Sequence, residues 1–330
     1  MGLLVEGKWV DRWYDTQKRD GRFIRSEAAF RNWITADGAP GPTGEGGFAA
    51  ASGRYHLYIS YACPWAHRTL IFRHLMGLDE HVGLSVVHHF MGDEGWTFEA
   101  GDGVVPDPVM NANKFYELYL RAMPNYSGRV TVPLLWDKDR DTIVSNESAE
   151  IIRMFNCSFR EVATPLGGPG SDFWPEELRE EMEAINDRVY HAINNGVYKA
   201  GFATTQSAYA EAVTEVFAAL DEMEERLATR RYLMGDRLTE ADWRLFATLV
   251  RFDAVYHSHF KCSKRMLREY PNLSAYTREL YQYPGISATV RFDHIREHYF
   301  RSHESINPAR IVPLAPELDF DAPHGRERLG

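Results

Sequence analysis

The stretch YHLYISYACPWAHRTLIFRHLMG, residues 55–77, decides the fold of the first half of this chain. Its first six residues, 55–60, alternate in the way that a β-strand does. Cys63-Pro64 follows, and proline at the first helical position favours the start of a helix. We expect this helix over residues 65–76, with Gly77 as its stop. The stretch therefore predicts a strand that leads into a helix, with Cys63 at the junction.

The residues after this stretch complete a small mixed domain. Residues 84–89 predict a second strand, and a long loop follows at 90–113. Residues 132–136 and 143–144 flank the polar turn DKDRD and predict a hairpin. A helix is expected over about 148–155, with Asn146 as a plausible cap. The order β-α-β, then β-β-α, predicts an α/β domain over residues 51–162.

The second half of the chain predicts helices only. Residues 163–174 have the Gly/Pro-rich composition of a linker, and Pro175 starts a helical run. A second run over about 207–229 places its apolar residues on one face. Thr239 and Asp242 resemble a capping box before another helix. We therefore expect an all-α domain over 175–307, an irregular N-terminal extension over 1–50, and an extended C-terminal tail over 308–330.

Composition limits the possible functions. A length of 330 residues fits about two domains, and a net charge of −10 argues against a general nucleic-acid binder. The sequence has no apolar run of 18 residues and no signal pattern at its start, so we expect no membrane partner and no secretion. Three cysteines do not suggest a disulfide framework. These features predict a soluble protein of a reducing compartment, the cytoplasm.

Cys63 is the residue most informative about chemistry. A helix N-terminus favours an anion, so the pKa of a thiol at this position should fall and the reactive thiolate should form. Ala66 stands where a C-x-x-C pair has its second cysteine, and a monothiol needs an external thiol to resolve a disulfide. The alternative is a buried, inert cysteine. Cys157 and Cys262 lack a comparable setting, and we interpret both as inert.

Two further positions suggest ligand contacts. Pro133 opens the third predicted strand, where proline is tolerated, and its peptide bond with Val132 is either trans, the common form, or cis. Glu147 and Ser148 begin the following helix. The free N–H groups there could receive a ligand carboxylate, and Glu147 could pair with an ammonium group. Ordinary helix capping is the alternative.

The segments YISYACPWAHRTL and GRVTVPLLWDKDRDTIVSNESAEIIRMFN resemble the Xi class of the glutathione transferase superfamily, the glutathionyl-hydroquinone reductases. The resemblance extends from about residue 40 to about residue 305. It implies a thioredoxin-like N-terminal domain followed by an all-helical domain, and a homodimer. It also implies glutathione as co-substrate and aromatic quinol conjugates as partners, with no metal and no nicotinamide.

The resemblance also implies roles for individual residues. Cys63 matches the nucleophile of the family, and Tyr198 and Tyr299 match tyrosines of its quinol pocket. Core packing is the alternative for either tyrosine, because the chain has 17 of them. The implied glutathione contacts are Trp96 against the tripeptide, Arg129 on a carboxylate, the backbone of Val132 beside a cis-Pro133, and Glu147 and Ser148 at the γ-glutamyl end.

The activity implied is the glutathione-dependent reduction of S-glutathionyl-hydroquinones to hydroquinones. It passes through a mixed disulfide between Cys63 and glutathione, which a second glutathione resolves. Three alternatives remain open: a broader thiol transferase or dehydroascorbate reductase that uses the same cysteine, a conjugating transferase, and a glutathione-binding protein without turnover. The pattern His294-x-x-Glu297-His298 formally fits a zinc protease. A working site also needs a third ligand and a placed base, and 13 histidines make chance matches easy, so we interpret the pattern as a polar helix face.

Overall fold

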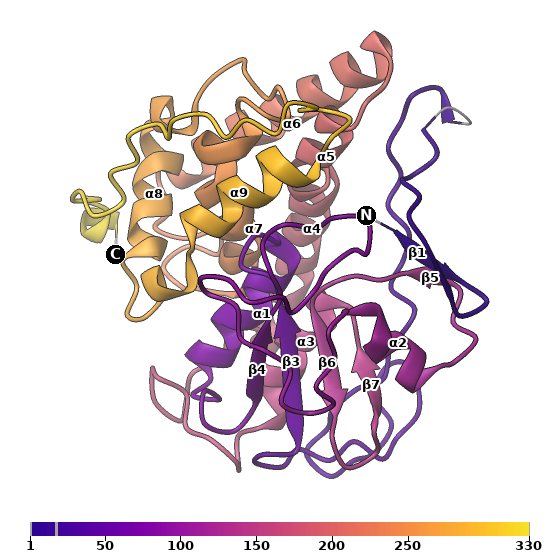
Figure 1. Cartoon of the computed structure of the whole chain (residues 1–330). Coiled ribbons are helices and arrows are strands. Elements are labelled where there is room, and N and C mark those ends of the chain that lie inside the picture. Colours follow the sequence, from indigo (N-terminus) through magenta and orange to yellow (C-terminus); the bar gives the residue numbers. More distant parts are fainter. Residues whose placement is uncertain (1, 17–18, 330) are drawn as a thin grey trace. The chain divides into compact units, whose positions relative to one another are not determined.

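The computed structural model describes residues 2–16 and 19–329 and divides into two compact units (Figure 1). Unit 1 comprises Met1–Trp13 and Ser26–Asp172. Unit 2 comprises Tyr14–Arg25 and Phe173–Gly330. A short segment of the N-terminal extension therefore belongs to the unit that contains the C-terminal half of the chain.

A four-stranded sheet forms the centre of unit 1. Its strands are β3 (Tyr55–Ile59), β4 (Gly83–Val86), β6 (Leu134–Asp137) and β7 (Thr142–Ser145), and their order is β4-β3-β6-β7 (Figure 1). β3 runs parallel to β4 and antiparallel to β6, and β6 and β7 form the predicted hairpin. Every residue of β3 and β6 is buried. The predicted thioredoxin-like order is confirmed.

Two helices of unit 1 begin where the sequence predicts. Helix α1 (Pro64–Leu75) follows β3 directly, and helix α3 (Ser148–Ser158) follows β7 and packs against α1. The prediction that Asn146 caps α3 is wrong. Glu147 is the N-cap, and its carboxylate accepts the N–H of Ala149 at 2.9 Å. Asn146 instead accepts the N–H of Phe30 through its side-chain oxygen, a tertiary contact that local sequence does not reveal.

The irregular structure predicted for the start of the chain is wrong for residues 3–10. Strands β1 (Leu3–Val5) and β2 (Lys8–Val10) form a hairpin, and β1 also pairs with β5 (Gly128–Arg129). The indole of Trp9 stacks on Tyr116, in helix α2 (Tyr116–Ala122), with ring centroids 5.0 Å apart. Strands this short carry too few residues for a period-2 pattern to be recognised.

Unit 2 is helical, as predicted. The predicted run over 207–229 is helix α6, and the capping box before α7 is confirmed, because the backbone N–H of Thr239 donates to Asp242 at 2.8 Å. The sequence did not predict two π-helical turns, Tyr190–Asn194 and Phe252–Tyr256. The helices are α4 (Arg179–Val189), α5 (Gly196–Gly201), α6 (Gln206–Leu227), α7 (Glu240–Arg251), α8 (Pro271–Tyr281) and α9 (Phe292–Ser302).

The C-terminal tail is largely without regular structure, as expected, but it is anchored to the helices of unit 2. Arg326 is buried, and its guanidinium donates to the carbonyl oxygens of Arg230 at 2.6 Å and Arg231 at 2.7 Å. The ring of Phe320 stacks on Tyr281 and on Phe292. No local sequence pattern indicates that the tail packs in this way.

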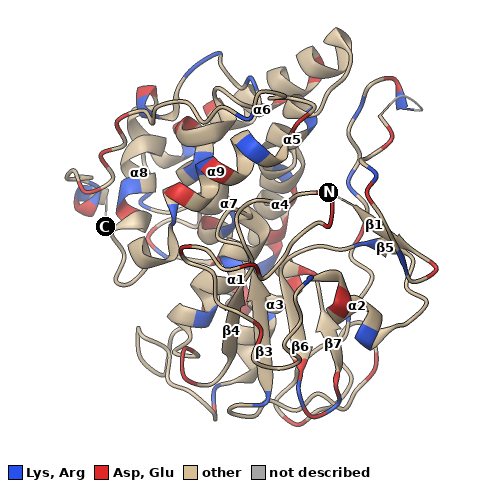
Figure 2. Ribbon diagram, viewed as in Figure 1, with Lys and Arg blue, Asp and Glu red and all other residues tan. Residues whose placement is uncertain are grey.

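Charges of both signs lie side by side on the helix surfaces, for example along α2 and α9 (Figure 2). Within the described part of the chain, no helix is long and apolar enough to cross a membrane.

Candidate active site: a thiol at a helix N-terminus and a chain of tyrosine hydroxyls

Cys63 is the N-cap residue of α1. Its backbone is extended, its carbonyl accepts the N–H of His67 at 2.9 Å, and its side chain makes no capping hydrogen bond. The half-buried thiol lies 3.6 Å from the carbonyl oxygen of Val132, to which the S–H donates. The first turn of α1 contains no acidic residue. The thiol therefore lies at the positive end of a helix dipole, a setting that favours the thiolate.

The other two cysteines lie in different settings. Cys262 is fully buried, and burial raises its pKa to about 12. Cys157 is exposed near the end of α3, away from any helix N-terminus. Cys262 is therefore buried, as its interpretation as an inert cysteine requires, whereas Cys157 is not buried, and its inertness stays a prediction.

The peptide bond between Val132 and Pro133 is cis, so the less common form is confirmed. This bond precedes β6 and places the Val132 carbonyl beside the thiol. Among the described residues, the backbone N–H of Val132 has no hydrogen-bond partner. A backbone donor and acceptor on one residue, next to a reactive thiol, suit an extended peptide that pairs as an additional strand.

The N-terminus of α3 is joined to α1 by Arg68. This buried arginine, on α1, donates through Nε and Nη2 to the hydroxyl of Ser148, at 3.0 and 2.7 Å. Its Nη2 lies 3.9 Å from the carboxylate of Glu147, and its guanidinium lies over the ring of Trp65. Two donors fill the acceptor positions of the Ser148 hydroxyl, so its own hydrogen is left to donate. The arrangement is suited to a carboxylate at the helix N-terminus.

Trp96 and Arg129, which the resemblance assigns to the glutathione site, both contact other parts of unit 1. Trp96 is largely buried in unit 1, and its carbonyl accepts the N–H of Phe115 at 2.9 Å. Arg129 lies in β5, and its Nη1 donates to the carbonyl oxygens of Arg12 at 2.5 Å and Gly2 at 3.4 Å. That nitrogen of Arg129 is therefore engaged with the N-terminal strand region.

Unit 2 contains a chain of three tyrosine hydroxyls. The phenol oxygen of Tyr299, on α9, lies 2.5 Å from that of Tyr198, on α5, and 3.0 Å from that of Tyr256. Tyr256 is 0% exposed and Tyr299 is 1% exposed, whereas Tyr198 is half-buried. The chain therefore runs from a half-buried tyrosine, Tyr198, to a fully buried one, Tyr256.

Burial keeps the inner hydroxyls of this chain protonated. It raises the pKa of Tyr256 and of Tyr299 well above the ordinary value, and the positive charge of Arg251 opposes part of this effect. Arg251 is itself fully buried at the end of α7, where it donates to the carbonyl of Ala247 at 2.7 Å. At neutral pH the inner tyrosines therefore act as hydrogen-bond donors and not as phenolates.

Sequence reasoning missed Arg68 and Tyr256. Arg68 follows Cys63 by five positions, which places it one turn into α1, and this spacing could have suggested it. Tyr256 ends a π-helical turn, and no motif marks it among the tyrosines of the chain. Both residues act through tertiary contacts.

The zinc-protease pattern has no metal-binding geometry around it. His294 and His298 lie on α9 and are both buried, so the prediction of a polar helix face is wrong for these two residues. In the described ranges, no group of three or more His, Cys, Asp or Glu residues is placed to hold a metal ion.

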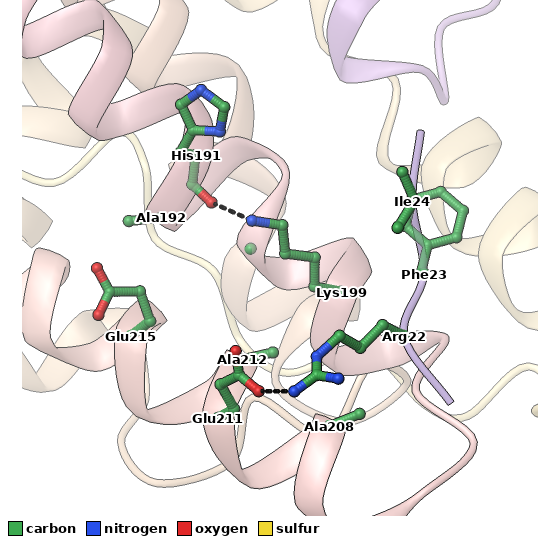
Figure 3. Close-up of a pocket in the computed structure, with 11 residues that line it drawn as sticks. Arg22, Phe23, Ile24, His191, Ala192, Lys199, Ala208, Glu211, Ala212 and Glu215 are labelled. Atoms are coloured by element: carbon green, nitrogen blue, oxygen red, sulfur yellow. Dashed lines mark hydrogen bonds and ion pairs between the residues drawn. The ribbon is translucent and has the colours of Figure 1, made fainter. Parts of the chain in front are cut away.

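A separate cavity of about 340 Å³ opens on unit 2 and does not include the tyrosine chain (Figure 3). Arg22 and Glu211 pair on one side of it at 2.8 Å, and Lys199 donates to the carbonyl of His191 at 3.1 Å (Figure 3). Phe23 and Ile24 form another part of its wall.

Two family models match the chain. Residues 62–156 match the N-terminal domain of glutathione S-transferases, and residues 206–279 match the C-terminal domain. The first match contains Cys63, Arg68, Val132 and Ser148, so it covers the thiol site described above.

Full-length relatives are similar over both units. The chain is 56% identical to glutathionyl-hydroquinone reductase YqjG of Escherichia coli, over 99% of both chains, and 50% identical to glutathionyl-hydroquinone reductase PcpF of Sphingobium chlorophenolicum, over 96% of both. The glutathione-bound structure of YqjG superposes with a TM-score of 0.90 over 98% of this chain and 99% of that one, at 53% identity. A Xi-class transferase of Natrialba magadii gives a TM-score of 0.90 at 48% identity, over 100% and 97%. The chain belongs to the Xi class of the glutathione S-transferase superfamily, the class of the glutathionyl-hydroquinone reductases.

Proposed function

We propose that this protein reduces S-glutathionyl-hydroquinones to hydroquinones with glutathione as the reductant. The observation that carries the proposal is a single thiol, Cys63, at the N-terminus of α1, with Ala66 where a second cysteine would close a disulfide. The names of the two relatives, both glutathionyl-hydroquinone reductases, support the same activity.

In the first step, the Cys63 thiolate attacks the sulfur atom of the conjugate. A sulfur–sulfur bond forms, the bond between sulfur and the ring carbon breaks, and the electron pair of that bond leaves with the ring. A proton then replaces sulfur on the ring carbon and gives the free hydroquinone. The ring is thereby reduced by two electrons, and the two sulfur atoms are oxidised to the mixed disulfide.

In the second step, the thiolate of another glutathione attacks the glutathione sulfur of the mixed disulfide. Glutathione disulfide leaves, and the Cys63 thiolate is regenerated. A cysteine at a helix N-terminus is a good leaving group here, because the dipole stabilises its anion. The cycle needs only the conjugate, glutathione and one proton.

Glutathione binding follows from the free backbone and helix-terminal groups of unit 1. We assign the Val132 N–H and carbonyl to the cysteinyl part of the tripeptide, and the hydroxyl and N–H of Ser148 to its γ-glutamyl carboxylate. Arg68 orients the Ser148 hydroxyl, and Glu147 pairs with the ammonium group.

Two more residues complete the proposed glutathione site. We assign to Trp96 the contact with the tripeptide that the resemblance implies. Arg129 binds a carboxylate by exchanging its contacts with the backbone of Arg12 and Gly2.

The tyrosine chain of unit 2 serves the aromatic half of the substrate. Tyr198 is the least buried tyrosine of this hydroxyl chain, so we assign its hydroxyl the contact with the quinol, where it donates to the oxygen that carries the developing negative charge. Tyr299 stands behind Tyr198 and is linked to Tyr256, so the chain holds the Tyr198 hydroxyl in one orientation.

The assay that tests this function follows menadiol release from glutathionyl-menadiol in the presence of glutathione. Dehydroascorbate and a mixed disulfide of glutathione compete for the same cysteine and test the broader thiol transferase. Conjugation of a chlorinated nitrobenzene tests the conjugating transferase, an activity that a cysteine at this position disfavours because it forms a mixed disulfide with glutathione. Steady release of menadiol supports the proposal. Glutathione binding without turnover of any of these substrates would instead support a glutathione-binding protein without catalytic activity.

We further propose that the protein is a homodimer of the cytoplasm, where glutathione keeps thiols reduced. The dimer is what the resemblance to the Xi class implies. Light scattering of the purified protein should give a mass of about twice that of one chain, and a mass of one chain contradicts the dimer.

A further inference from the structure

The segment Tyr14–Arg25 belongs to unit 2, and two of its side chains anchor it there. Phe23 is buried, and its ring lies 5.4 Å from that of Phe202 and 4.8 Å from that of Tyr14. Arg22 pairs with Glu211 of α6 at the wall of the cavity (Figure 3). The residues directly before Arg25 are therefore held against unit 2.

This anchoring gives Arg25 a defined position. The guanidinium carbon of Arg25 lies 4.9 Å from the ring centroid of Tyr198 and 5.6 Å from that of Phe23. Its Nε donates to the side-chain oxygen of Asn195 at 3.2 Å. Asn195 is the residue before α5, so Arg25 is held by the same helix that carries Tyr198.

A cation over the face of a tyrosine ring acts on its hydroxyl. The positive charge attracts the π-electrons and favours the build-up of negative charge on the ring, which strengthens the O–H as a hydrogen-bond donor. Tyr198 is the half-buried end of the hydroxyl chain, and its hydroxyl lies 2.5 Å from that of Tyr299. The contact with Arg25 therefore strengthens the hydroxyl to which the proposed function assigns the contact with the quinol.

We propose that Arg25 is a positioning residue for hydroquinone release: it fixes the ring of Tyr198 and strengthens its hydroxyl as a donor to the aromatic leaving group. This inference rests on the proposed function and gives the N-terminal segment a part in the reaction. Its effect is confined to substrates whose leaving group is an aromatic ring, because a thiolate leaving group needs no proton from a tyrosine.

The test compares two reactions of full-length Arg25→Met, Arg25→Lys and Arg22→Met variants. One substrate is glutathionyl-menadiol, and the other is the mixed disulfide of glutathione and 2-mercaptoethanol. Arg22→Met is the matched control. It removes a cation from the same segment, but this cation pairs with Glu211 and does not contact a tyrosine ring. Circular dichroism verifies that each variant is folded.

We expect Arg25→Met to lower kcat for menadiol release by about tenfold, the size of a partly buried cation–π contact, and to leave disulfide reduction unchanged. Arg25→Lys should recover part of the loss, and Arg22→Met should behave as the wild type in both reactions. Equal losses in both reactions, or the same loss with Arg22→Met, would show that the segment only holds the fold and would overturn the inference. Unchanged menadiol release by Arg25→Met would overturn it too.

Failure of the proposed function has a different signature. A wild-type protein that reduces the disulfide but releases no menadiol contradicts both the function and the inference. A wild-type protein that releases menadiol, together with an Arg25→Met variant that does so equally well, contradicts only the inference.

Discussion

The phenol oxygens of Tyr198 and Tyr299 lie 2.5 Å apart, although 101 positions separate the two residues in the chain. Tyr299 also contacts the hydroxyl of Tyr256, so it is the central member of the chain. A central hydroxyl that accepts one hydrogen bond and donates another transmits the orientation of the buried end to the accessible end.

Replacement of Tyr299 by phenylalanine should therefore reduce activity more than replacement of Tyr256. Tyr299→Phe removes both hydrogen bonds of the chain, and we expect kcat for glutathionyl-menadiol to fall by tenfold or more, about the effect of losing one positioned donor. Tyr256→Phe leaves the contact between Tyr198 and Tyr299 intact and should lower kcat by about threefold, which is within the net value of one hydrogen bond. Steady-state assays at saturating glutathione measure both. A larger loss in Tyr256→Phe would contradict this order.

Ser148→Ala should weaken glutathione binding. The substitution removes the hydroxyl that Arg68 orients, and a hydrogen bond to a charged group contributes about 1.5–3 kcal/mol, so KM for glutathione should rise by at least about tenfold. Ser148→Thr keeps a hydroxyl at this position and should retain most of the affinity. An unchanged KM in Ser148→Ala would show that the γ-glutamyl carboxylate binds elsewhere.

Alkylation should distinguish the cysteines. At pH 7.5, a short pulse of iodoacetamide should modify Cys63 first, because the helix N-terminus favours its thiolate. Cys262 should stay unmodified in the folded protein, because it is 0% exposed and its pKa is raised to about 12. Peptide mapping by mass spectrometry measures the extent at each cysteine, and bound glutathione should protect Cys63. Faster modification of Cys157 than of Cys63 would contradict the activated thiol.

Acid should destabilise the protein through buried His56. Burial lowers the pKa of His56 from 6.5 to about 4, and its ring contacts the hydroxyl of Ser85 at 2.8 Å. Between pH 6.5 and 4 the unfolded chain binds a proton that the folded chain does not, so the free energy of unfolding falls as the pH falls. In that window, His56 lowers the free energy of unfolding by up to about 1.4 kcal/mol for each pH unit of acidification. Above pH 6.5 it adds no pH dependence to the free energy of unfolding.

The variant His56→Gln should reduce this slope, because glutamine keeps a hydrogen-bonding group and cannot take up the proton. Urea unfolding at pH 7.5, 5.5 and 4.5 measures it. His191→Gln is the control, since the side chain of His191 is 59% exposed. Equal slopes in the wild type and in His56→Gln would contradict a neutral buried imidazole.

The sequence predicted the elements with strong local signals. The strand 55–60, the helix after Cys63, the hairpin and the capping box at Thr239 were correct, because alternation, N-terminal proline and capping chemistry act within a few residues. The strands of the first ten residues and the buried Arg326 were not predicted, since they depend on partners far away in the chain.

The residues of the candidate site show the same distinction between local signals and distant partners. Cys63, Ser148 and the cis bond at Pro133 lie at element boundaries that the sequence marks. Arg68 and Tyr256 were missed because each acquires its importance from a residue on another helix.

The central claim is that Cys63 takes the glutathionyl group from an aromatic conjugate. The most direct test is a single turnover of the wild type and of Cys63→Ser with glutathionyl-menadiol, followed by intact-protein mass spectrometry and then by addition of glutathione. We predict free menadiol together with a glutathione adduct on Cys63 that added glutathione removes, and neither of them in Cys63→Ser. An adduct that forms from glutathione disulfide while no menadiol is released from the conjugate would contradict the account.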